Sequence, residues 1–342
     1  MKVWIAKLSE KKNLLRCLRE VLEHVPFTWR EGEVVAVKLH IGEVGNTTFL
    51  RPEYARVVYE WLKDKKVLPF LTDTTVIYRG KRNNGIEAHE TAIFHGFGFA
   101  PFIVADGIRG VDGVKVRVDG IREKEVKIAR AVYESDALFV LSHFKGHGVT
   151  GFGGAIKNLG MGCSTKEGKL KMHSGTSPWI DKEKCTGCGL CFEACPFNAI
   201  KLEAHAEIIP DKCSGCGACI SACPVKAIRI KWDASSRALI ERMVDHALGA
   251  VRKKRAFYIN FLVNITPECD CFPYSKPPVA PDIGLVAGED PVAVDQASYD
   301  LVVEKTGHDP FKKLYPQIDP AYQLACGEKA GLGRRKYERE EL

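Results

Sequence analysis

The sequence predicts an α/β fold, in which a host domain with a parallel or mixed sheet flanked by helices is interrupted by a small α+β lobe rich in cysteine. Three observations support this prediction. Short apolar segments alternate with amphipathic segments on both sides of the middle of the chain. Eight of the 13 cysteines fall between Cys185 and Cys223. These eight repeat at an offset of 28 residues, which indicates a duplicated unit.

The strands of the host domain are predicted where apolar residues follow one another in short runs. These runs are 34–39, 67–71, 102–105, 137–141, 257–263 and 283–286. Helices are predicted where apolar residues recur at helical spacing, in 53–65, 124–134, 235–251 and 290–304. Pro52 in a first turn and Asp290 as an N-cap mark two of the helix starts. We expect the charged tail, 334–342, to be frayed.

The simplest organisation is a discontinuous host domain with one insertion. Residues 1–178 and 233–342 would form the host domain, and residues 179–232 the inserted lobe. Two tandem domains are the alternative. That arrangement is disfavoured because the C-terminal flank has few predicted strands of its own.

Composition and charge exclude several classes of protein. The chain has 342 residues, of which 45% are hydrophobic and 27% charged, as is typical of a folded globular protein. Its formal net charge of +7 comes with no long basic run, so no nucleic-acid partner is predicted. Without a long apolar run or a signal-peptide stretch, we expect no membrane span and a cytoplasmic location. Clustered thiols in that compartment indicate metal binding rather than disulfides.

The two cysteine runs have the spacing of iron–sulfur ligands. Each reads Cys-x2-Cys-x2-Cys-x3-Cys-Pro, and in two-cluster proteins the fourth thiolate of each [4Fe-4S] cluster comes from the other run. We therefore assign one cluster to Cys185, Cys188, Cys191 and Cys223, and the other to Cys213, Cys216, Cys219 and Cys195. Zinc also binds four cysteines, but this pattern occurring twice is atypical of zinc sites. The segment resembles two-cluster bacterial ferredoxins, and the resemblance implies one-electron transfer.

A glycine-rich segment, 142–163, follows the predicted strand before the lobe. It includes a Gly-x-Gly-x-x-Gly spacing that begins at Gly146. Backbone amides in such a loop can hold a phosphate or carboxylate, and a lysine can neutralise it. The candidate residues for this role are Gly148, Gly151, Gly153 and Gly154, with Lys145 and Lys157 as the neutralising lysines. The alternative is that the glycines serve turns and close packing.

Several segments of the host domain resemble the DUF362 family of uncharacterised iron–sulfur-centre proteins. They are 38–42, 50–52, 72–74, 142–163, 269–271, 281–284 and 290–293. The resemblance implies an α/β fold, often with a ferredoxin insert, and no settled reaction. The spacing of His147, Lys157 and His173 is also similar to that in nickel-pincer lactate racemases. There the lysine attaches the cofactor, the second histidine binds nickel and the first moves a proton.

Two further groups are candidate site residues. His40, Arg51 and Asp73 lie just after predicted strands, where ligands bind in open α/β sheets, and an arginine can bind a carboxylate or phosphate with two hydrogen bonds. A third metal site is predicted from Cys163, His173, Cys269 and Cys271. Reduced structural thiols are the alternative.

Together these features predict an iron–sulfur redox protein that passes single electrons between the lobe and a ligand or metal site in the host domain. If it is an enzyme, we expect an iron–sulfur oxidoreductase, and its candidate catalytic residues are Arg51, His147 and Lys157. We expect an electron donor or acceptor protein and a small anionic ligand as partners, and a further metal or small organic cofactor in the host domain. Two alternatives stay open. One is an electron carrier or adaptor without catalysis, and the other is a non-redox metal-dependent isomerase with structural clusters.

Overall fold

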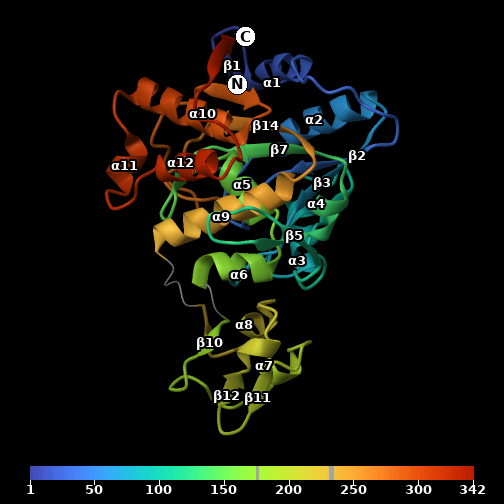
Figure 1. Cartoon of the computed structure of the whole chain (residues 1–342), viewed down its shortest axis with the longest axis vertical. Coiled ribbons are helices and arrows are strands. Elements are labelled where there is room, and N and C mark those ends of the chain that lie inside the picture. The colour runs from blue at the N-terminus through green and yellow to red at the C-terminus, as the bar shows by residue number, and fades with distance from the viewer. Residues whose placement is uncertain (175–176, 231–234) are drawn as a thin grey trace.

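A computed structural model describes residues 1–174, 177–230 and 235–342, which form a large α/β body with a small lobe at one end (Figure 1). The body is built on an eight-stranded sheet in the order β16-β1-β15-β14-β7-β2-β3-β4. In chain order its strands are β1 (Lys2–Lys7), β2 (Val34–Lys38), β3 (Leu68–Asp73), β4 (Phe102–Val104), β7 (Ala137–His143), β14 (Arg255–Leu262), β15 (Gly284–Gly288) and β16 (Glu338–Glu341). The predicted mixed α/β class is confirmed.

The sheet is parallel over its centre and antiparallel towards one edge. β7 lies between β2 and β14 and is parallel to both, so that Phe139 is opposite Val37 on one side and Phe257 on the other. β15 runs antiparallel to β14 and β1, and β16 returns parallel to β1. The parallel arrangement brings the carboxyl ends of β2, β3, β7 and β14 to one edge of the sheet.

Helices cover both faces of the sheet. Successive strand residues point to opposite faces, and apolar residues on both faces are buried under helices. In β7, Leu138 and Val140 pack into one buried cluster, whereas Phe139 and Leu141 pack into the other. The first cluster is covered by α4 (Arg130–Glu134), α5 (Ala155–Gly162), α6 (Lys166–Ser174), α9 (Ser236–Val251), α10 (Pro291–Thr306), α11 (Pro310–Leu314) and α12 (Tyr322–Lys329). The second is covered by α1 (Leu14–Glu23), α2 (Pro52–Asp64) and α3 (Gly85–Phe94).

Two antiparallel hairpins extend the body outside the main sheet. β5 (Gly113–Arg117) pairs with β6 (Glu125–Ala129), and β8 (Lys145–His147) pairs with β9 (Gly151–Gly153). The second hairpin leads directly into α5, so it helps to position the residues that follow β7.

The cysteine-rich segment forms its own group of short elements between α6 and α9, at the lower end of Figure 1. β10 (Trp179–Ile180) pairs with β13 (Ile228–Arg229), which brings the two ends of this lobe together. Between them lie α7 (Leu190–Glu193), β11 (Ile200–Leu202), β12 (Ala206–Ile208), a 3-10 turn (Pro210–Lys212) and α8 (Ala218–Ala222). Its definition as an inserted domain, 179–232, stays a prediction. Residues 231–232 of that range, and 175–176 and 233–234 of the predicted host domain, lie outside the described residues.

The predicted helix 124–134 is wrong in its first half. Residues Glu125–Ala129 form strand β6, and only Arg130–Glu134 are helical. Val126 and Ile128 are buried while Lys127 between them is not, and this period of two suits a strand. The strand pairs with β5, and nothing in the local sequence of residues 124–134 indicates this partner.

The expectation of a frayed C-terminal tail is also wrong. Glu338–Glu341 form β16, which pairs with β1 along the edge of the main sheet. Lys7 lies 2.6 Å from Glu341, and a second pair joins Lys2 to Glu340. The charged side chains that suggested a solvated tail belong instead to an exposed strand at the edge of the sheet, where charged side chains are common.

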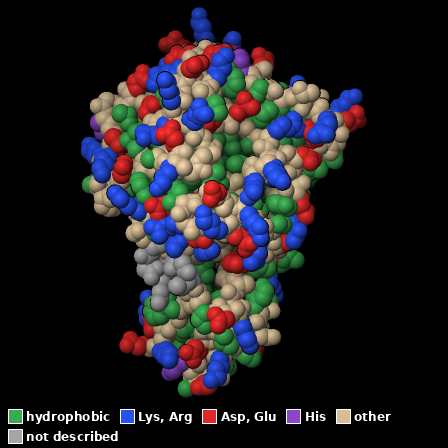
Figure 2. Space-filling model, in the orientation of Figure 1, with side chains coloured by type: hydrophobic (Ala, Val, Ile, Leu, Met, Phe, Trp, Pro, Cys, Tyr) green, Lys and Arg blue, Asp and Glu red, His purple; other side chains and the backbone are tan. Residues whose placement is uncertain are grey.

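The surface carries both signs of charge in close mixture. On the face shown in Figure 2, basic and acidic side chains are interspersed over the body and the lobe. Among the helices within residues 1–174, 177–230 and 235–342, none has both the length and the apolar character needed to cross a membrane.

A buried carboxylate on α10 fixes the start of α5. Asp295 accepts hydrogen bonds from the backbone N–H of Ala155 at 2.7 Å and of Ile156 at 2.9 Å, and from the Nδ2 of Asn260 in β14 at 2.7 Å. Burial raises the pKa of Asp295 to about 6, although these three donors act to lower it. A Cβ at Gly154 would lie 2.3 Å from the Asp295 carboxylate, so this close approach requires glycine.

We expect Asp295→Ala to lower the free energy of unfolding by about 2–4 kcal/mol, because it leaves three buried donors without their acceptor. Urea unfolding followed by circular dichroism would measure it. Glu304→Ala on the same helix is the control, since its ion pair with Arg339 is exposed and should contribute less than about 0.5 kcal/mol. Equal losses for the two variants would contradict the role assigned to Asp295.

Candidate functional site

A cavity of about 930 Å³ opens at the edge of the sheet where the parallel strands end. His40 follows β2, Asp73 ends β3 and His143 ends β7, and all three line it. Side chains from β8, α5, α6 and three loops complete the wall. They include Glu43, Tyr78, Arg82, Lys145, His147, Lys157, Lys169, His173, Cys269 and Cys271. Strand ends in open α/β sheets are the usual place for a ligand site.

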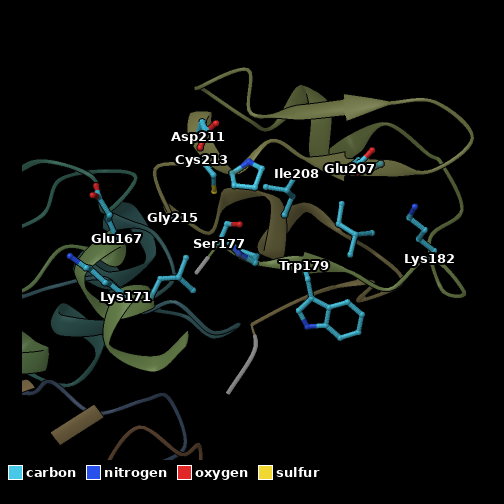
Figure 3. Close-up of a pocket in the computed structure, with 15 residues that line it drawn as sticks. Glu167, Lys171, Ser177, Trp179, Lys182, Glu207, Ile208, Asp211, Cys213 and Gly215 are labelled. Atoms are coloured by element: carbon cyan, nitrogen blue, oxygen red, sulfur yellow. The ribbon is translucent and has the colours of Figure 1, made fainter. Parts of the chain in front are cut away.

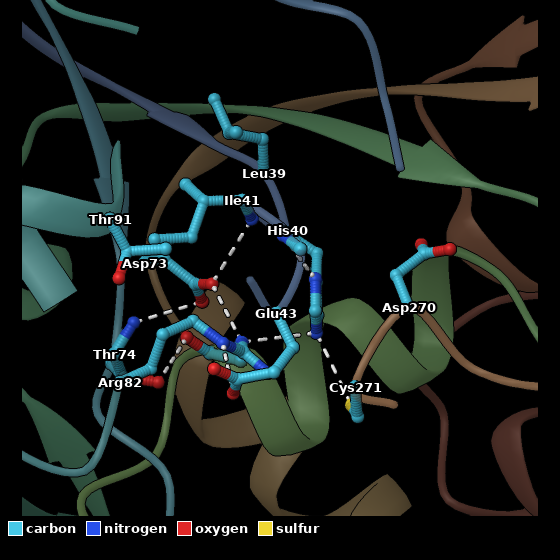
Figure 4. Close-up of polar contacts among 12 residues, drawn as sticks. Leu39, His40, Ile41, Glu43, Asp73, Thr74, Arg82, Thr91, Asp270 and Cys271 are labelled. Carbon is cyan, nitrogen blue, oxygen red and sulfur yellow. Dashed lines mark hydrogen bonds and ion pairs between the residues drawn. The ribbon is translucent and has the colours of Figure 1, made fainter. Parts of the chain in front are cut away.

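One wall of the cavity is a buried ion-pair network (Figure 4). Arg82 lies 3.3 Å from Glu43 and 3.8 Å from Asp73, and it donates a 2.7 Å hydrogen bond to the hydroxyl of Tyr78. Lys38, at the end of β2, lies 3.0 Å from the other oxygen of Asp73. Burial acts to raise the pKa of Asp73, but Lys38 and then the other nearby cations outweigh it and lower the pKa. The carboxylate therefore stays charged at neutral pH.

A second buried carboxylate, Asp270, holds the loop that carries the two cysteines. His143 Nδ1 lies 2.9 Å from one oxygen of Asp270, and Lys145 Nζ lies 3.2 Å from the same oxygen. The other ring nitrogen of His143 is 3.0 Å from the carbonyl oxygens of Val263 and Asn264. Both ring nitrogens thus face acceptors, which suits a doubly protonated ring. Although burial opposes it, this pair of cations lowers the pKa of Asp270 far below its usual value.

Cys269 and Cys271 flank Asp270 and meet at the cavity wall. Their sulfur atoms are 2.8 Å apart, and the Nε2 of His40 is 3.3 Å from Cys271. The ligand atoms of His40, Cys269 and Cys271 all lie within 4.8 Å of one another, close enough for one metal ion. On the opposite side, the ammonium group of Lys157 is 3.8 Å from the Cys269 sulfur. The structure thus brings together two of the four residues predicted for a third metal site and adds His40 to them.

His147 and His173 line the same cavity as Lys157. Burial, and then the nearby charge of Lys157, lower the pKa of His147 well below its usual value. The same causes lower the pKa of His173 to about 4. The Nδ1 of His147 accepts from the backbone N–H of Thr150 at 3.2 Å, and the hydroxyl of Thr150, 3.0 Å from the same nitrogen, donates to the carbonyl of Phe152 at 2.6 Å. Both histidines are therefore uncharged at neutral pH.

Two of the predicted residues lie away from this group. Arg51 is exposed at the N-cap of α2 and is not among the cavity-lining residues. Cys163, at the end of α5, packs into the buried cluster under the sheet, and burial raises its pKa to about 11. Neither is part of the close group formed by His40, Cys269 and Cys271.

Some glycines of the 142–163 segment line the cavity, and some allow close packing of the backbone. Gly153 and Gly154 line the cavity. Gly151 has φ +80°, and a Cβ there would lie 2.8 Å from Pro320. A regular helix, α5, follows the loop, but its first amides already bond to Asp295. These contacts support the close-packing alternative for Gly151 and Gly154, while a Cβ at Gly148 would meet only Tyr315, at 3.6 Å.

In the lobe, the eight cysteines surround two separate small cavities. One is lined by Cys185, Cys188, Cys191 and Cys223, and the other by Cys195, Cys213, Cys216 and Cys219. These are the two sets that the sequence assigned to two clusters, with one cysteine of each set taken from the other run. The clusters themselves stay a prediction.

The lobe rests on the segment that forms one wall of the host cavity. Arg79 donates to the carbonyl oxygen of Ile220 at 3.1 Å and also contacts the carbonyl of Cys223. Ile77 and Tyr78 pack against the apolar interior of the lobe, and both also line the host cavity. This segment is therefore the partition between the cysteines of the lobe and the thiols of the host.

A second cavity, of about 700 Å³, lies between α6 and the lobe (Figure 3). Glu167 and Lys171 of α6 lie on one side of it and Trp179 and Ile208 of the lobe on the other. Cys213 also lines it, so one predicted cluster ligand faces this opening.

Sequence reasoning missed most of the charged wall. Glu43, Tyr78 and Arg82 lie on loops without a recognisable motif. His143 and Asp270 stood beside predicted residues, and the position of Asp270 between two cysteines was the one local signal that could have drawn attention to it.

Comparison with known proteins gives little beyond the family. No curated protein sequence matches this chain. The solved lactate racemase apoprotein from Thermoanaerobacterium thermosaccharolyticum is 15% identical, with a TM-score of 0.43 over 84% of this chain and 54% of that one. A crystal structure of a protein from Thermotoga maritima is 14% identical, with a TM-score of 0.48 over 86% of this chain and 60% of that one. This chain thus corresponds to less than two thirds of the length of either.

The family match covers most of the host domain and the whole lobe. Residues 35–300 match the family described as a domain of unknown function, DUF362. That range includes the strands that end at the cavity, the glycine-rich segment, both cysteine runs and the pair Cys269 and Cys271. The chain therefore belongs to the DUF362 family.

Proposed function

We propose that this protein is an iron–sulfur electron-transfer protein, in which two [4Fe-4S] clusters in the lobe exchange single electrons with a group held in the host cavity. The observation that carries the proposal is the grouping of eight cysteines around two cavities, four to each, with one cysteine exchanged between the runs. That exchange is the ligand pattern of two-cluster ferredoxins.

The residues around the two cavities suit clusters of this kind. Four thiols converge on each cavity. Backbone N–H groups approach the exchanged sulfurs, from Ala199 to Cys195 at 3.3 Å and from Ala227 to Cys223 at 3.2 Å. Such N–H groups stabilise thiolate ligands and tune their potential. When bound, the clusters would supply one-electron redox chemistry.

The order of the groups along the molecule favours a route from the surface to the host cavity. Cys188, in the first set, is exposed to solvent. In the second set, the loop at Gly217 lies against Ile77 and Lys166 of the host. An electron donor or acceptor protein, the partner expected from the sequence, would thus approach the first set, while the second set lies towards the host cavity.

Tyr78 links the second half of this route. It packs against the lobe interior and lines the host cavity, and burial raises its pKa although the charge of Arg82 acts to lower it. Its hydroxyl accepts from Arg82, which in turn contacts His40 at 3.2 Å. Because these groups lie close together in one chain, electron transfer between the lobe and the host cavity would need no diffusive encounter.

Lys157 is the cavity residue best placed to bind a small anionic ligand. Among the cavity lysines, Lys145 faces the carboxylate of Asp270, whereas the ammonium group of Lys157 lies 3.8 Å from the sulfur of Cys269. The neutral His147 and His173 beside it would accept or donate hydrogen bonds without adding charge.

Anaerobically purified protein should contain about eight iron and about eight acid-labile sulfide atoms per chain. It should be brown, and it should give electron paramagnetic resonance signals after reduction with dithionite. Colourless protein with stoichiometric zinc would overturn the proposal. Iron at this level together with stoichiometric nickel would instead favour the isomerase alternative.

Pairs of cysteine substitutions test the exchange of ligands between the runs. The double variant Cys188→Ser with Cys223→Ser removes two ligands of one predicted cluster and should retain about four iron atoms. The double variant Cys213→Ser with Cys223→Ser removes one ligand from each and should destabilise both clusters.

Iron analysis and resonance spectra would distinguish the two variants. Cys17→Ser with Cys326→Ser is the matched control, because both residues are buried in the host and should leave all the iron in place. Identical iron loss from both test variants would contradict the exchanged assignment.

A further inference from the structure

We propose that Cys269 and Cys271 form a redox-active dithiol that reduces a small disulfide entering the host cavity, with Cys271 as the attacking sulfur and Cys269 as the resolving one. The two sulfurs are 2.8 Å apart and both line the cavity. The pair needs no element of the lobe, so this inference holds whether or not the lobe carries clusters.

The neighbours of the pair distinguish the two sulfurs. The Nε2 of His40 lies 3.3 Å from Cys271, and the Cys269 thiol can donate to the same sulfur. A thiol that donates to Cys271 stabilises that sulfur as a thiolate. We therefore assign Cys271 as the attacking sulfur and Cys269 as the resolving one.

The donors around His40 oppose a metal ion at this place. The backbone N–H of Gly42 donates to Nδ1 of His40 at 3.0 Å, and Nη1 of Arg82, which can only donate, lies 3.2 Å from Nε2. A metal ion bound at Nε2 would have to displace the Arg82 guanidinium from that nitrogen.

The charged side chains around the two cysteines also favour a thiolate over a metal ion. Arg82 lies 3.2 Å from the Nε2 of His40, and Lys157 lies 3.8 Å from the sulfur of Cys269. These cations stabilise an anionic sulfur, whereas they would repel a divalent ion held between the two thiols.

The exchange balances with one disulfide as oxidant. The Cys271 thiolate attacks one sulfur of the substrate, its S–S bond breaks, and one substrate thiolate leaves. Cys269 then loses its proton and attacks Cys271, which forms the Cys269–Cys271 disulfide and releases the second substrate thiol. A dithiol reductant returns the pair to its starting state by supplying two electrons and two protons.

Peptide mapping of the full-length protein tests this directly. We would treat the anaerobically purified, reduced protein with 5,5′-dithiobis(2-nitrobenzoate), a disulfide with two carboxylates, then alkylate, digest and analyse residues 269–271 by mass spectrometry. Wild type should show an internal disulfide with no attached probe, and dithiothreitol should reverse it. Cys269→Ser should retain the probe at Cys271, because the resolving thiol is missing. Cys271→Ser should react at least about tenfold more slowly at Cys269.

Cys326→Ser is the control and should behave as wild type at this peptide, because Cys326 is buried away from the cavity. The wild-type mapping by itself decides the matter if a variant does not fold. Probe attached to both cysteines of the wild type, or to neither, would overturn the proposal. So would a stoichiometric metal that must be chelated before either thiol reacts. Iron content measured on the same sample tests the proposed clusters separately.

Discussion

The buried carboxylate of Asp270 is the constraint on which the candidate site depends. It lies between the two cavity cysteines, and His143 and Lys145 hold it from the end of β7 and from β8. Its own carbonyl oxygen accepts from the N–H of Glu43, which joins the loop to the segment after β2. Removing both cations would leave the Asp270 carboxylate buried without a charged partner, and such a loss is costly. The position of the two thiols is therefore fixed by electrostatics at the edge of the sheet rather than by a regular element.

Several charges around the cavity are paired with an opposite charge, and among the described residues two lysines contact neutral groups instead. One of them, Lys169, donates to the Thr74 hydroxyl at 2.7 Å and to the Ser164 carbonyl at 2.6 Å. Lys38 and Arg82 face Asp73 and Glu43, and Lys145 faces Asp270. Lys157 faces sulfur instead, and the two histidines beside it are neutral. A cavity of this kind suits an anionic sulfur or an anionic ligand, and this is common ground for the proposed electron transfer and the proposed thiol chemistry. The partition at Ile77 and Tyr78 connects both to the lobe.

The glycine-rich segment shows how tertiary packing decides the meaning of a local pattern. Its spacing is compatible with an anion-binding loop before a helix, and a helix does follow. The first amides of that helix are nevertheless occupied by Asp295, which comes from α10, 140 residues away in sequence. Gly154 is glycine because that carboxylate leaves no room for a Cβ. The segment still serves the site, since α5 carries Lys157 into the cavity.

The sequence by itself determined the α/β class and six of the eight strands of the main sheet, because apolar runs are local properties of the chain. The two sets of four cysteines follow from their spacing, and the clusters assigned to them stay a prediction. The predictions for residues 124–134 and for the tail were wrong because each segment forms a strand only through its partner, β5 for the first and β1 for the second. The site was predicted in part. His147, Lys157, His173, Cys269 and Cys271 were named, but only the fold placed His40 beside Cys271, from 231 residues away, and left Arg51 outside. Such contacts arise when parallel strands end at one edge of the sheet, and no spacing along the chain records that edge.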